Sequence, residues 1–546
     1  MKTNHTKLIY GLLVAGAFIA MTDRTRAQGK DTTLRPTTIE VIQSYKPEVK
    51  QVPKPEFTPD LPPRDTSRPA FRYEVPQQTL YYSYSSLPIR PLALGRDTSR
   101  LPFPGYLRLA AGNLSTIMLD AGTAHLRGKD YETSLLVHHL SQQGKIRNQQ
   151  QSLTGVELRG TLHRSRHAWT GTVSFNRNRY HYYGYDHSIY EYDAEDVRQT
   201  FTGIDAGIMV RNEGAGAWSY GPELRIATYN DAYDASERQV TVNVPFARVA
   251  DSGFTYGAGV YGSLVNFSNP AGEISNNLFQ LRPFVQVRAS GFSARAGLYP
   301  SFGMNEQFWL LPDLSLSYRI PNSRLAISGG YEATVRQNTY RQLSTYNPYM
   351  FNMYETRQTR VDEIKGLLQT NLGDHFVLSG GVSWQQFRDL PVFLNDSADL
   401  KNFYVRYLSR VQAISFNAGL RYQVADAFIV NAALVYTNFN SFDEDQDRVW
   451  HEPGMQLKAD LTYRPTAALS LTAYGNILNQ IYALDRNHET IRLDGIFDLG
   501  AGAEYQFIPR LSAFINARNI LNNRYERWYR YEAYGINILG GIRLKF

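Results

Sequence analysis

The sequence predicts an all-β fold: a transmembrane antiparallel β-barrel of about 22 strands, preceded by an extended leader rich in proline. Segments in which apolar and polar residues alternate with a period of two follow one another from Gly105 to Phe546. Short and long connections alternate between these segments. The composition adds 38 Tyr, 27 Phe and 41 Gly, which is typical of many strands with aromatic girdles at both membrane interfaces.

Residues 1–27 have the pattern of a signal peptide for secretion. Lys2 and Lys7 precede an apolar run from Leu8 to Met21, and Ala27 offers a small residue for cleavage. The run is shorter than the roughly 20 apolar residues that a membrane helix needs, and no later run approaches that length. We therefore expect a removed signal peptide, and an inner-membrane helical protein is excluded.

Residues 28–104 form the leader, in which Pro recurs among Lys, Arg, Asp and Thr. This composition favours an extended, polyproline-like chain that buries little apolar surface. Two islands break the pattern. The first consists of Thr38, Ile39, Glu40, Val41 and Ile42, and it can add as a strand to the sheet edge of a periplasmic or outer-membrane protein partner. The second runs from Gln78 to Ser86 with Tyr81, Tyr82 and Tyr84, and it can lie inside the barrel or under its rim. A flexible tether explains each island equally well.

Residues 105–546 form the predicted barrel, whose strands are polar on one face and apolar on the other. Val156 and Leu158 alternate with Glu157 and Arg159, for example. Charges on the polar face exclude a soluble core and indicate a wet lumen. The lumen-lining candidates are Glu157, Arg159, Lys458, Asp460 and Arg543. They either line a solute path or pair with one another and with the leader.

The last strand is the clearest case of this alternation. Ile538, Ile542, Leu544 and Phe546 share one face, and Arg543 lies on the other. A terminal strand of this kind would be an aggregation-prone edge in a soluble protein, whereas a closed barrel pairs it on both sides. We expect its apolar face to contact outer-membrane lipid.

The connections alternate in length along the chain. Tight turns are predicted at 127–130, 164–166, 213–216, 251–253, 290–291, 321–323, 373–374, 425–426, 465–466 and 509. Long connections are predicted at 181–197, 268–276, 337–356, 389–400, 441–449, 480–489 and 520–532. Short periplasmic turns and long outer loops are the asymmetry of outer-membrane barrels.

Composition also limits the chemistry. The absence of Cys excludes disulfides, thiol catalysis and a lipid-anchored cysteine, and the net charge of +7 is spread along the strands, so no nucleic-acid partner is expected. His139 with Ser141 and His163 with Ser165 have the spacing of an outer-membrane hydrolase, but no third group can be assigned. We expect no enzyme, no metal and no cofactor. The acidic residues 443–447 lack the pattern of a calcium loop.

Two tyrosine clusters lie in or beside the long connections. Tyr180, Tyr182, Tyr183 and Tyr185 form the first, and Tyr340, Tyr346, Tyr349 and Tyr354 form the second. An aromatic girdle at the membrane interface explains them best. Binding of carbohydrate or peptide is the alternative.

Residues 511–525, followed by Gly535 and the ending Gly540-Gly541-Ile542-Arg543-Leu544-Lys545-Phe546, resemble the end of TonB-dependent receptors. The stretch includes Asn519, Asn522 and Tyr525 in that family's N-x-x-N-x-x-Y loop, and Tyr463-Arg464-Pro465-Thr466 is similar to its periplasmic turns. The resemblance implies an outer-membrane location in a Gram-negative cell. It also implies that Ile538, Ile542, Leu544 and Phe546 are recognised by the barrel-insertion machinery.

The leader departs from that family, because it is too short and too rich in Pro to fold as the family's plug domain. The sequence is similar to plugless, porin-like receptor barrels of the sort numerous in Bacteroidota. Such barrels imply either solute transport across the outer membrane or a structural or assembly role, with the leader docking a partner.

Overall fold

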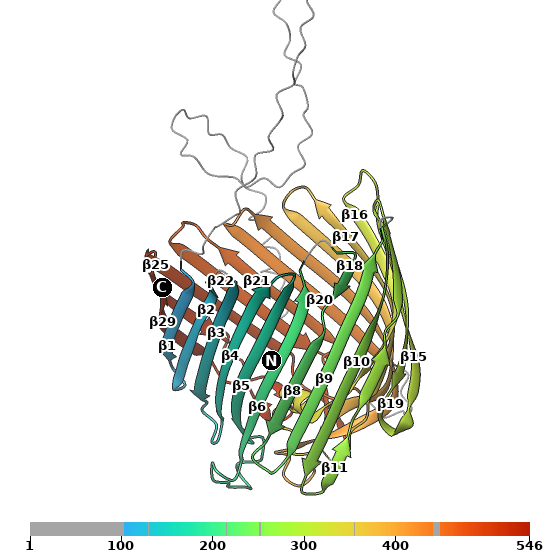
Figure 1. Cartoon of the computed structure of the whole chain (residues 1–546). Coiled ribbons are helices and arrows are strands. Elements are labelled where there is room, and N and C mark those ends of the chain that lie inside the picture. Colours follow the sequence, from blue (N-terminus) through green and yellow to red (C-terminus); the bar gives the residue numbers. More distant parts are fainter. Residues whose placement is uncertain (1–102, 129, 214–215, 251–252, 354, 441–447) are drawn as a thin grey trace, which may run out of the picture. The chain divides into compact units, whose positions relative to one another are not determined.

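The computed structural model describes residues 103–546, except 129, 214–215, 251–252, 354 and 441–447 (Figure 1). The predicted signal peptide, nearly all of the leader and the island Thr38–Ile42 lie outside the described residues. So do the acidic residues 443–447 and Tyr354.

The wall of the barrel contains 22 antiparallel strands, as predicted. The first half consists of β1 (Gly105–Gly112), β2 (Thr116–Arg127), β3 (Tyr131–Gln143), β4 (Gln150–Arg164), β5 (His167–His181), β6 (Arg198–Asn212), β7 (Trp218–Tyr220) with β8 (Glu223–Asn230), β9 (Ser236–Val249), β10 (Phe254–Asn269), β12 (Leu278–Leu281) with β13 (Phe284–Ala289), and β14 (Phe292–Phe302). The second half consists of β15 (Phe308–Arg319), β16 (Leu325–Arg336), β17 (Thr359–Leu372), β18 (Phe376–Asn395), β19 (Phe403–Val424), β20 (Phe428–Asn440), β21 (Met455–Tyr463), β22 (Leu469–Asn479), β25 (Ile496–Ile508), β26 (Leu511–Arg518) and β29 (Asn537–Lys545).

Small elements lie in the connections between wall strands. They are β11 (Gly272–Ser275), the short helix η1 (Met304–Glu306), the helix α2 (Tyr340–Tyr346), and the hairpins β23 (Tyr482–Leu484) with β24 (Thr490–Arg492) and β27 (Glu526–Trp528) with β28 (Tyr531–Glu532). Among the described residues, no helix is long and apolar enough to cross a membrane.

The barrel closes between its first and last strands. Strand β29 pairs with β26 on one side and with β1 on the other, where Leu107 faces Leu544 and Leu109 faces Ile542. Closure gives every wall strand two neighbours, so no backbone edge is left to meet the hydrocarbon of a bilayer.

The two ends of the barrel differ as the sequence predicts. The ten predicted tight turns all fall between consecutive wall strands, at the end where β1 begins and β29 finishes. The long connections gather at the opposite end, which we call the long-loop end.

One predicted long connection is wrong. Residues 389–395 continue β18, which pairs with β19 as far as Asn395 opposite Phe403; the register stays the same across Asp389, whose φ is 55°. The apolar run that contains Val392, Phe393 and Leu394 explains the extension, because these side chains are buried against residues of the long loops.

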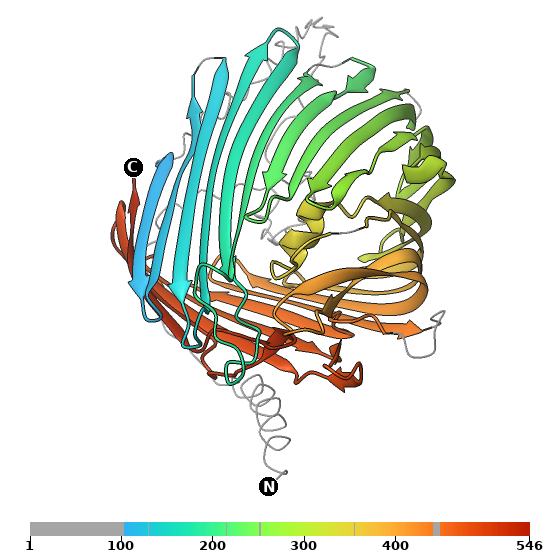
Figure 2. The same cartoon turned by 90° about the horizontal axis from the view of Figure 1, so that it is seen from below.

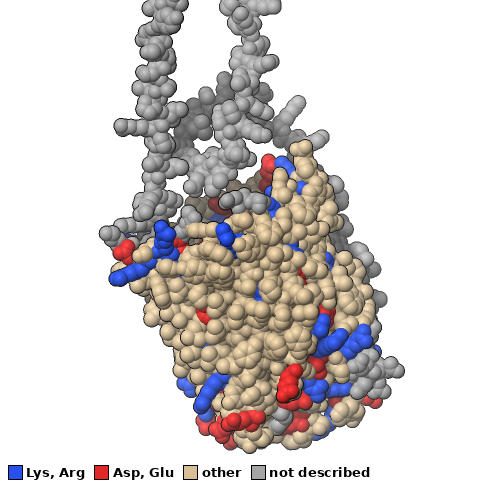
Figure 3. Space-filling model, turned by 45° about the vertical axis from the view of Figure 1, so that its right-hand side comes forward, with Lys and Arg blue, Asp and Glu red and all other residues tan. Residues whose placement is uncertain are grey.

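The outer face of the barrel is apolar around its middle. Large exposed hydrophobic side chains occur on almost every wall strand, including Leu158, Val173, Leu314 and Ile364. Figure 3 shows that Lys, Arg, Asp and Glu gather toward the two ends of the face in view, while the zone between them is almost free of charge. An apolar band between two charged rims fits a lipid bilayer.

Candidate functional site

Buried residues of five long connections pack against one another and against the wall strands. We call residues 182–197, 337–358, 396–402, 449–454 and 519–536 the loop cluster. Tyr183, Tyr340, Met350, Trp528 and Tyr531 from these loops share one buried core with wall residues from five strands. Those wall residues are Phe201, Tyr229, Phe267, Phe393 and Phe403. Figure 2, which looks along the barrel, shows α2 inside the ring of strands.

The helix α2 begins and ends for local reasons. The Thr339 hydroxyl accepts a hydrogen bond from the backbone N–H of Gln342, and the Gln342 side chain accepts one from the backbone N–H of Thr339. This reciprocal capping box satisfies two backbone donors at the start of a helix. Asn347 leaves the helical conformation and precedes Pro348, which ends the helix. The Thr-x-x-Gln spacing is the sequence feature that could have revealed α2, which sequence analysis missed.

Carboxylates of two wall strands and of the β8–β9 turn anchor α2. The Arg341 guanidinium donates two hydrogen bonds to Asp205 of β6, at 2.5 and 2.7 Å. The backbone N–H of Tyr340 donates to Glu237 of β9 at 2.6 Å, and its hydroxyl donates to Asp231 at 2.7 Å. Charge-assisted and bidentate bonds are the strongest class of hydrogen bond in proteins. They fix the position and the orientation of the helix against the wall.

Aromatic rings hold the remaining loops to α2 and to one another. Tyr349 stacks on Tyr531 with ring centroids 3.6 Å apart, and Tyr183 meets Tyr531 edge-on at 4.8 Å. Trp528 packs against Phe393 and Phe403 at 5.4 and 5.5 Å. Each such pair contributes about 0.5–1.5 kcal/mol beyond the burial of its apolar area. The loop cluster therefore has a packed core of its own.

The prediction that the tyrosine clusters form an aromatic girdle is wrong for four of their eight members. Tyr182, Tyr183, Tyr185 and Tyr340 are buried within the loop cluster and its contacts with the wall, not exposed to lipid. The alternation of apolar and polar residues cannot locate these tyrosines, because they lie in irregular segments. Their contacts are also distant in sequence: the Tyr182 hydroxyl donates a hydrogen bond to the carbonyl of Met350, more than a hundred residues away.

His451 and Glu452 are the titratable pair at the base of the loop cluster. His451 is fully buried, and burial lowers its pKa to about 3, so the ring is neutral. Its Nδ1 donates to the carbonyl of Phe393 at 2.9 Å, and its Nε2 accepts from the backbone N–H of Tyr529 at 3.3 Å. Burial raises the pKa of Glu452, which accepts a hydrogen bond from the Tyr346 hydroxyl.

The five lumen-lining candidates occupy the inner face of the wall. Glu157 and Arg159 pair with each other at 3.1 Å, and Arg543 pairs with Glu504 at 2.7 Å. Asp460 accepts a hydrogen bond from Asn431 at 2.7 Å and lies opposite Tyr474, which lines an interior cavity. Lys458 shares the strand face of Asp460 and is exposed. These charges pair mostly within the wall, so no single ligand site brings them together.

The four apolar residues predicted at the end of the chain occupy the opposite face. Ile538, Ile542, Leu544 and Phe546 are all exposed on the outside, while Arg543 on the same strand bonds inward to Glu504. Their predicted recognition by the insertion machinery stays a prediction.

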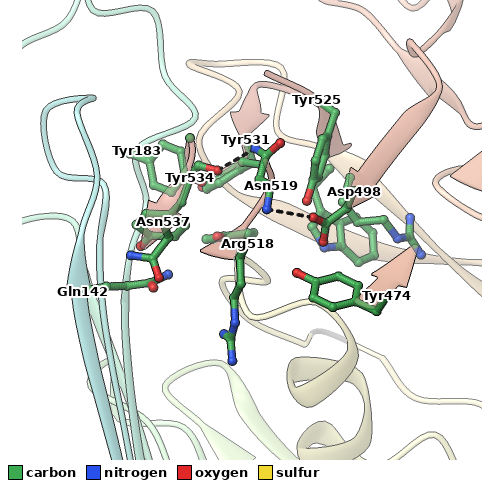
Figure 4. A pocket seen from close by; sticks show the side chains of 15 residues that line it. Gln142, Tyr183, Tyr474, Asp498, Arg518, Asn519, Tyr525, Tyr531, Tyr534 and Asn537 are labelled. Atoms are coloured by element: carbon green, nitrogen blue, oxygen red, sulfur yellow. Dashed lines mark hydrogen bonds between the residues drawn. The ribbon is translucent and has the colours of Figure 1, made fainter. Parts of the chain in front are cut away.

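One cavity lies directly beneath the loop cluster, with a volume of about 240 Å³ (Figure 4). Tyr183, Tyr531 and Tyr534 stand on one side, and Tyr474, Asp498 and Tyr525 on the other. The backbone N–H of Asn519 donates to Asp498 at 3.2 Å, while the Arg518 side chain extends beside Tyr474. Aromatic walls with a few polar groups are suited to a small organic solute.

The two His and Ser pairs do not form nucleophilic sites among the described residues. His139 bonds through Nδ1 to the Thr154 hydroxyl at 2.8 Å, and His163 bonds through Nδ1 to Glu213 at 2.9 Å. No hydrogen bond joins either histidine to its serine in the part of the chain that the structure describes. Within the same residues, no three His, Asp or Glu side chains group as a metal site.

In fold, the closed wall of 22 strands with long loops at one end matches the solved structures of TonB-dependent outer-membrane receptors. The FrpB iron transporter from Neisseria meningitidis, in its F3-3 variant, superposes with a TM-score of 0.65 at 11% identity, covering 82% of each chain. A point mutant of the ferric enterobactin receptor PfeA from Pseudomonas aeruginosa gives 0.63 at 11% identity over 81% of this chain and 80% of that one.

FpvA of Pseudomonas aeruginosa, bound to a heterologous pyoverdine and iron, gives a TM-score of 0.61 at 11% identity, covering 81% of this chain and 72% of that one. No protein-family model matches the sequence, and no curated protein matches it. The similarity is therefore one of fold alone. The fold is the barrel of TonB-dependent receptors, which the sequence motifs at the end of the chain also indicate.

Replacing Arg341 with Ala should loosen α2. The substitution removes two charge-assisted hydrogen bonds and leaves Asp205 without its partner, a loss of about 2 kcal/mol. Hydrogen–deuterium exchange of residues 340–347 in the folded barrel should accelerate by about tenfold or more.

The matched control for Arg341→Ala is Arg198→Ala, which removes an exposed ion pair with Glu195 near the same end of the barrel. Exposed pairs contribute about 0–1 kcal/mol, so the control should leave exchange in 340–347 almost unchanged. Equal exchange in both variants and the unmodified protein would contradict the anchoring of α2 by Asp205.

The stability of the loop cluster should fall as the pH drops below about 6.5. His451 has a pKa of about 3 when folded and 6.5 as its ordinary value, so below 6.5 the unfolded loop binds a proton that the folded loop does not. The loss should reach about 2 kcal/mol at pH 5. Amide exchange of residues 449–454 and 526–532, corrected for intrinsic rates, measures it.

Two variants separate the histidine from its neighbour. His451→Asn cannot titrate and should remove most of this pH dependence. Glu452 acts with the opposite sign, because its raised pKa stabilises the folded loop at low pH and that contribution is lost as the pH rises through the folded pKa. Glu452→Gln should therefore deepen the acid loss. An undiminished acid loss in His451→Asn would show that another group is responsible.

Proposed function

We propose that the protein is a transport barrel of the Gram-negative outer membrane, which moves a solute between the exterior and the periplasm. The observation that carries this proposal is the wide barrel with a charged inner face, whose long-loop end holds an anchored loop cluster. Barrels of 22 strands enclose a lumen too wide for wall side chains to fill. A solute path with a gate at one end accounts for both features.

The loop cluster is the gate in this proposal, and no catalytic role is assigned to it. TonB-dependent receptors carry a separate plug domain, whereas residues 28–104 have the composition of an extended leader. We propose a plugless barrel of the kind numerous in Bacteroidota, in which the leader regulates access to the lumen from the periplasm.

Targeting follows from the two ends of the sequence. Residues 1–27 would direct secretion through the inner membrane and then be removed. The outward face of Ile538, Ile542, Leu544 and Phe546 would be recognised by the barrel-insertion machinery. The long-loop end then faces the exterior and the short turns face the periplasm.

A structural or assembly role is the second candidate, and the packing of the loop cluster favours it. Tyr340, Met350 and Phe403 are fully buried, which is the packing of a static core and not of an open channel mouth. In this role the barrel anchors a complex in the membrane, and Thr38, Ile39, Glu40, Val41 and Ile42 dock a partner by strand addition.

Conductance in planar bilayers should separate the two functions. We expect the full chain to conduct weakly, because the loop cluster obstructs the lumen. A chain without residues 28–104 that also carries Arg341→Ala should conduct ions in steps if the barrel transports solutes. Each change alone should have an intermediate effect.

The same conductance measurements on the full chain, the two single changes and the double variant can also contradict transport. A double variant that folds, inserts and stays as closed as the full chain would contradict transport. Copurification of an envelope protein with the full chain, lost when Ile39 and Val41 are replaced with Asp, would then support the assembly role.

A further inference from the structure

Arg282 lies between β12 and β13 and lines three adjoining interior cavities below α2. Their volumes are about 500, 770 and 480 Å³. Gln342 and Tyr346 of α2 line two of the three, so the helix forms the roof over this arginine. The space can hold a solute of moderate size in contact with both the wall and the gate.

The other arginines that line two of these cavities are neutralised, and Arg336 lines the third. Arg341 pairs with Asp205, Arg225 pairs with Glu223 at 3.1 Å, and Arg295 pairs with Asp313 at 2.8 Å. No carboxylate oxygen of the described residues lies within 4.0 Å of the Arg282 guanidinium, whose hydrogen bonds go to neutral Gln280. A half-buried cation without a counter-charge is costly, and a bound anion would offset that cost.

The guanidinium of Arg282 is also held rigidly. The side-chain Oε1 of Gln280 accepts from both Nε and Nη2 of Arg282, at 3.1 and 2.5 Å, and the side-chain Nε2 of Gln280 donates to the Ser301 hydroxyl at 3.1 Å. Tyr261 covers one face of the guanidinium, 4.4 Å from its ring centroid. One edge and one face are thus occupied by the wall.

The terminal edge of the guanidinium, formed by Nη1 and the second proton of Nη2, makes no hydrogen bond within the described residues. Two parallel donors in a fixed fork match the oxygens of a carboxylate or a phosphate. Gln342 uses its side-chain oxygen in the capping box, which leaves its amide nitrogen to donate from the roof.

We propose that Arg282 is the centre of a binding site for an oxyanion, the carboxylate or phosphate group of a solute that enters the lumen. The site rests on the proposed transport function, because it names the class of solute that the barrel selects. Binding at Arg282 places the anion beneath Gln342 and Tyr346, in contact with the element that obstructs the long-loop end.

Titration calorimetry of the folded full chain in detergent tests the site, with inorganic phosphate and citrate as separate probes in a chloride buffer. We expect saturable binding of at least one probe. Arg282→Gln should weaken it by about tenfold to a hundredfold, the effect of losing charged hydrogen bonds. Binding of phosphate alone would indicate a solute with a phosphate group, and binding of citrate alone would indicate a solute with a carboxylate group.

The matched control is Arg288→Gln. Arg288 lies on β13, on the same strand face, and also bonds to a glutamine two residues before it, but it lines none of the three cavities. The Arg288→Gln variant should bind the probe with the affinity of the unmodified protein. Heat-modifiable migration of each variant confirms a folded barrel.

Absence of binding to both probes, or an equal loss in Arg282→Gln and Arg288→Gln, would overturn the proposed site. Because calorimetry requires no flux, a barrel that binds anions but never conducts would refute transport and leave the site standing. A barrel that conducts without binding either anion would support transport and refute the site at Arg282.

Discussion

The constraint on which the rest of the structure depends is the pairing of every strand edge. Backbone polar groups cannot face hydrocarbon unpaired, so a transmembrane sheet must close on itself, as β1 and β29 do here through Leu107 opposite Leu544. Closure over 22 strands then produces a lumen far wider than side chains can fill. Segments other than the wall strands must therefore fill or obstruct the lumen if it is not to stay open.

Among the described residues, the loop cluster fills the lumen at the long-loop end. Its α2 helix exists because of a local capping box, and it stays in the lumen because Asp205 and Glu237 of the wall, with Asp231 of the β8–β9 turn, bind its first turn. Aromatic packing around Tyr531 and Trp528 then ties the later loops to it. The same anchoring supports either a gate that opens or a fixed closure, so function depends on how often these few contacts break.

The barrel could be predicted from sequence because its determinants are local. Period-two alternation and turn residues locate the strands and the ten short turns, and the faces of β29 follow from Ile542 and Arg543 alone. The loop cluster could not be predicted in this way. The girdle prediction fails for Tyr182 and Tyr340 because nothing near them in sequence encodes their contacts with Met350 and Asp231, which lie about a hundred residues or more away.

The sequence carries local signals for two features that the period-two alternation does not predict. The capping box of Thr339 and Gln342 marks a helix within an irregular stretch, and the apolar run before Asn395 marks strand continuation, not a loop. The signal peptide, the leader and the island Thr38–Ile42 stay predictions, because they lie outside the described residues.

The central claim, that the long loops pack as a core inside the barrel, can be tested by thiol labelling in whole cells. The chain contains no Cys, so Ser344→Cys and Ser188→Cys each introduce a single thiol. Ser344 is 1% exposed beside the Tyr229 hydroxyl, whereas Ser188 is exposed in the 182–197 loop. A membrane-impermeant maleimide should label position 188 more than about tenfold faster than position 344. Equal labelling rates would contradict the packed loop cluster.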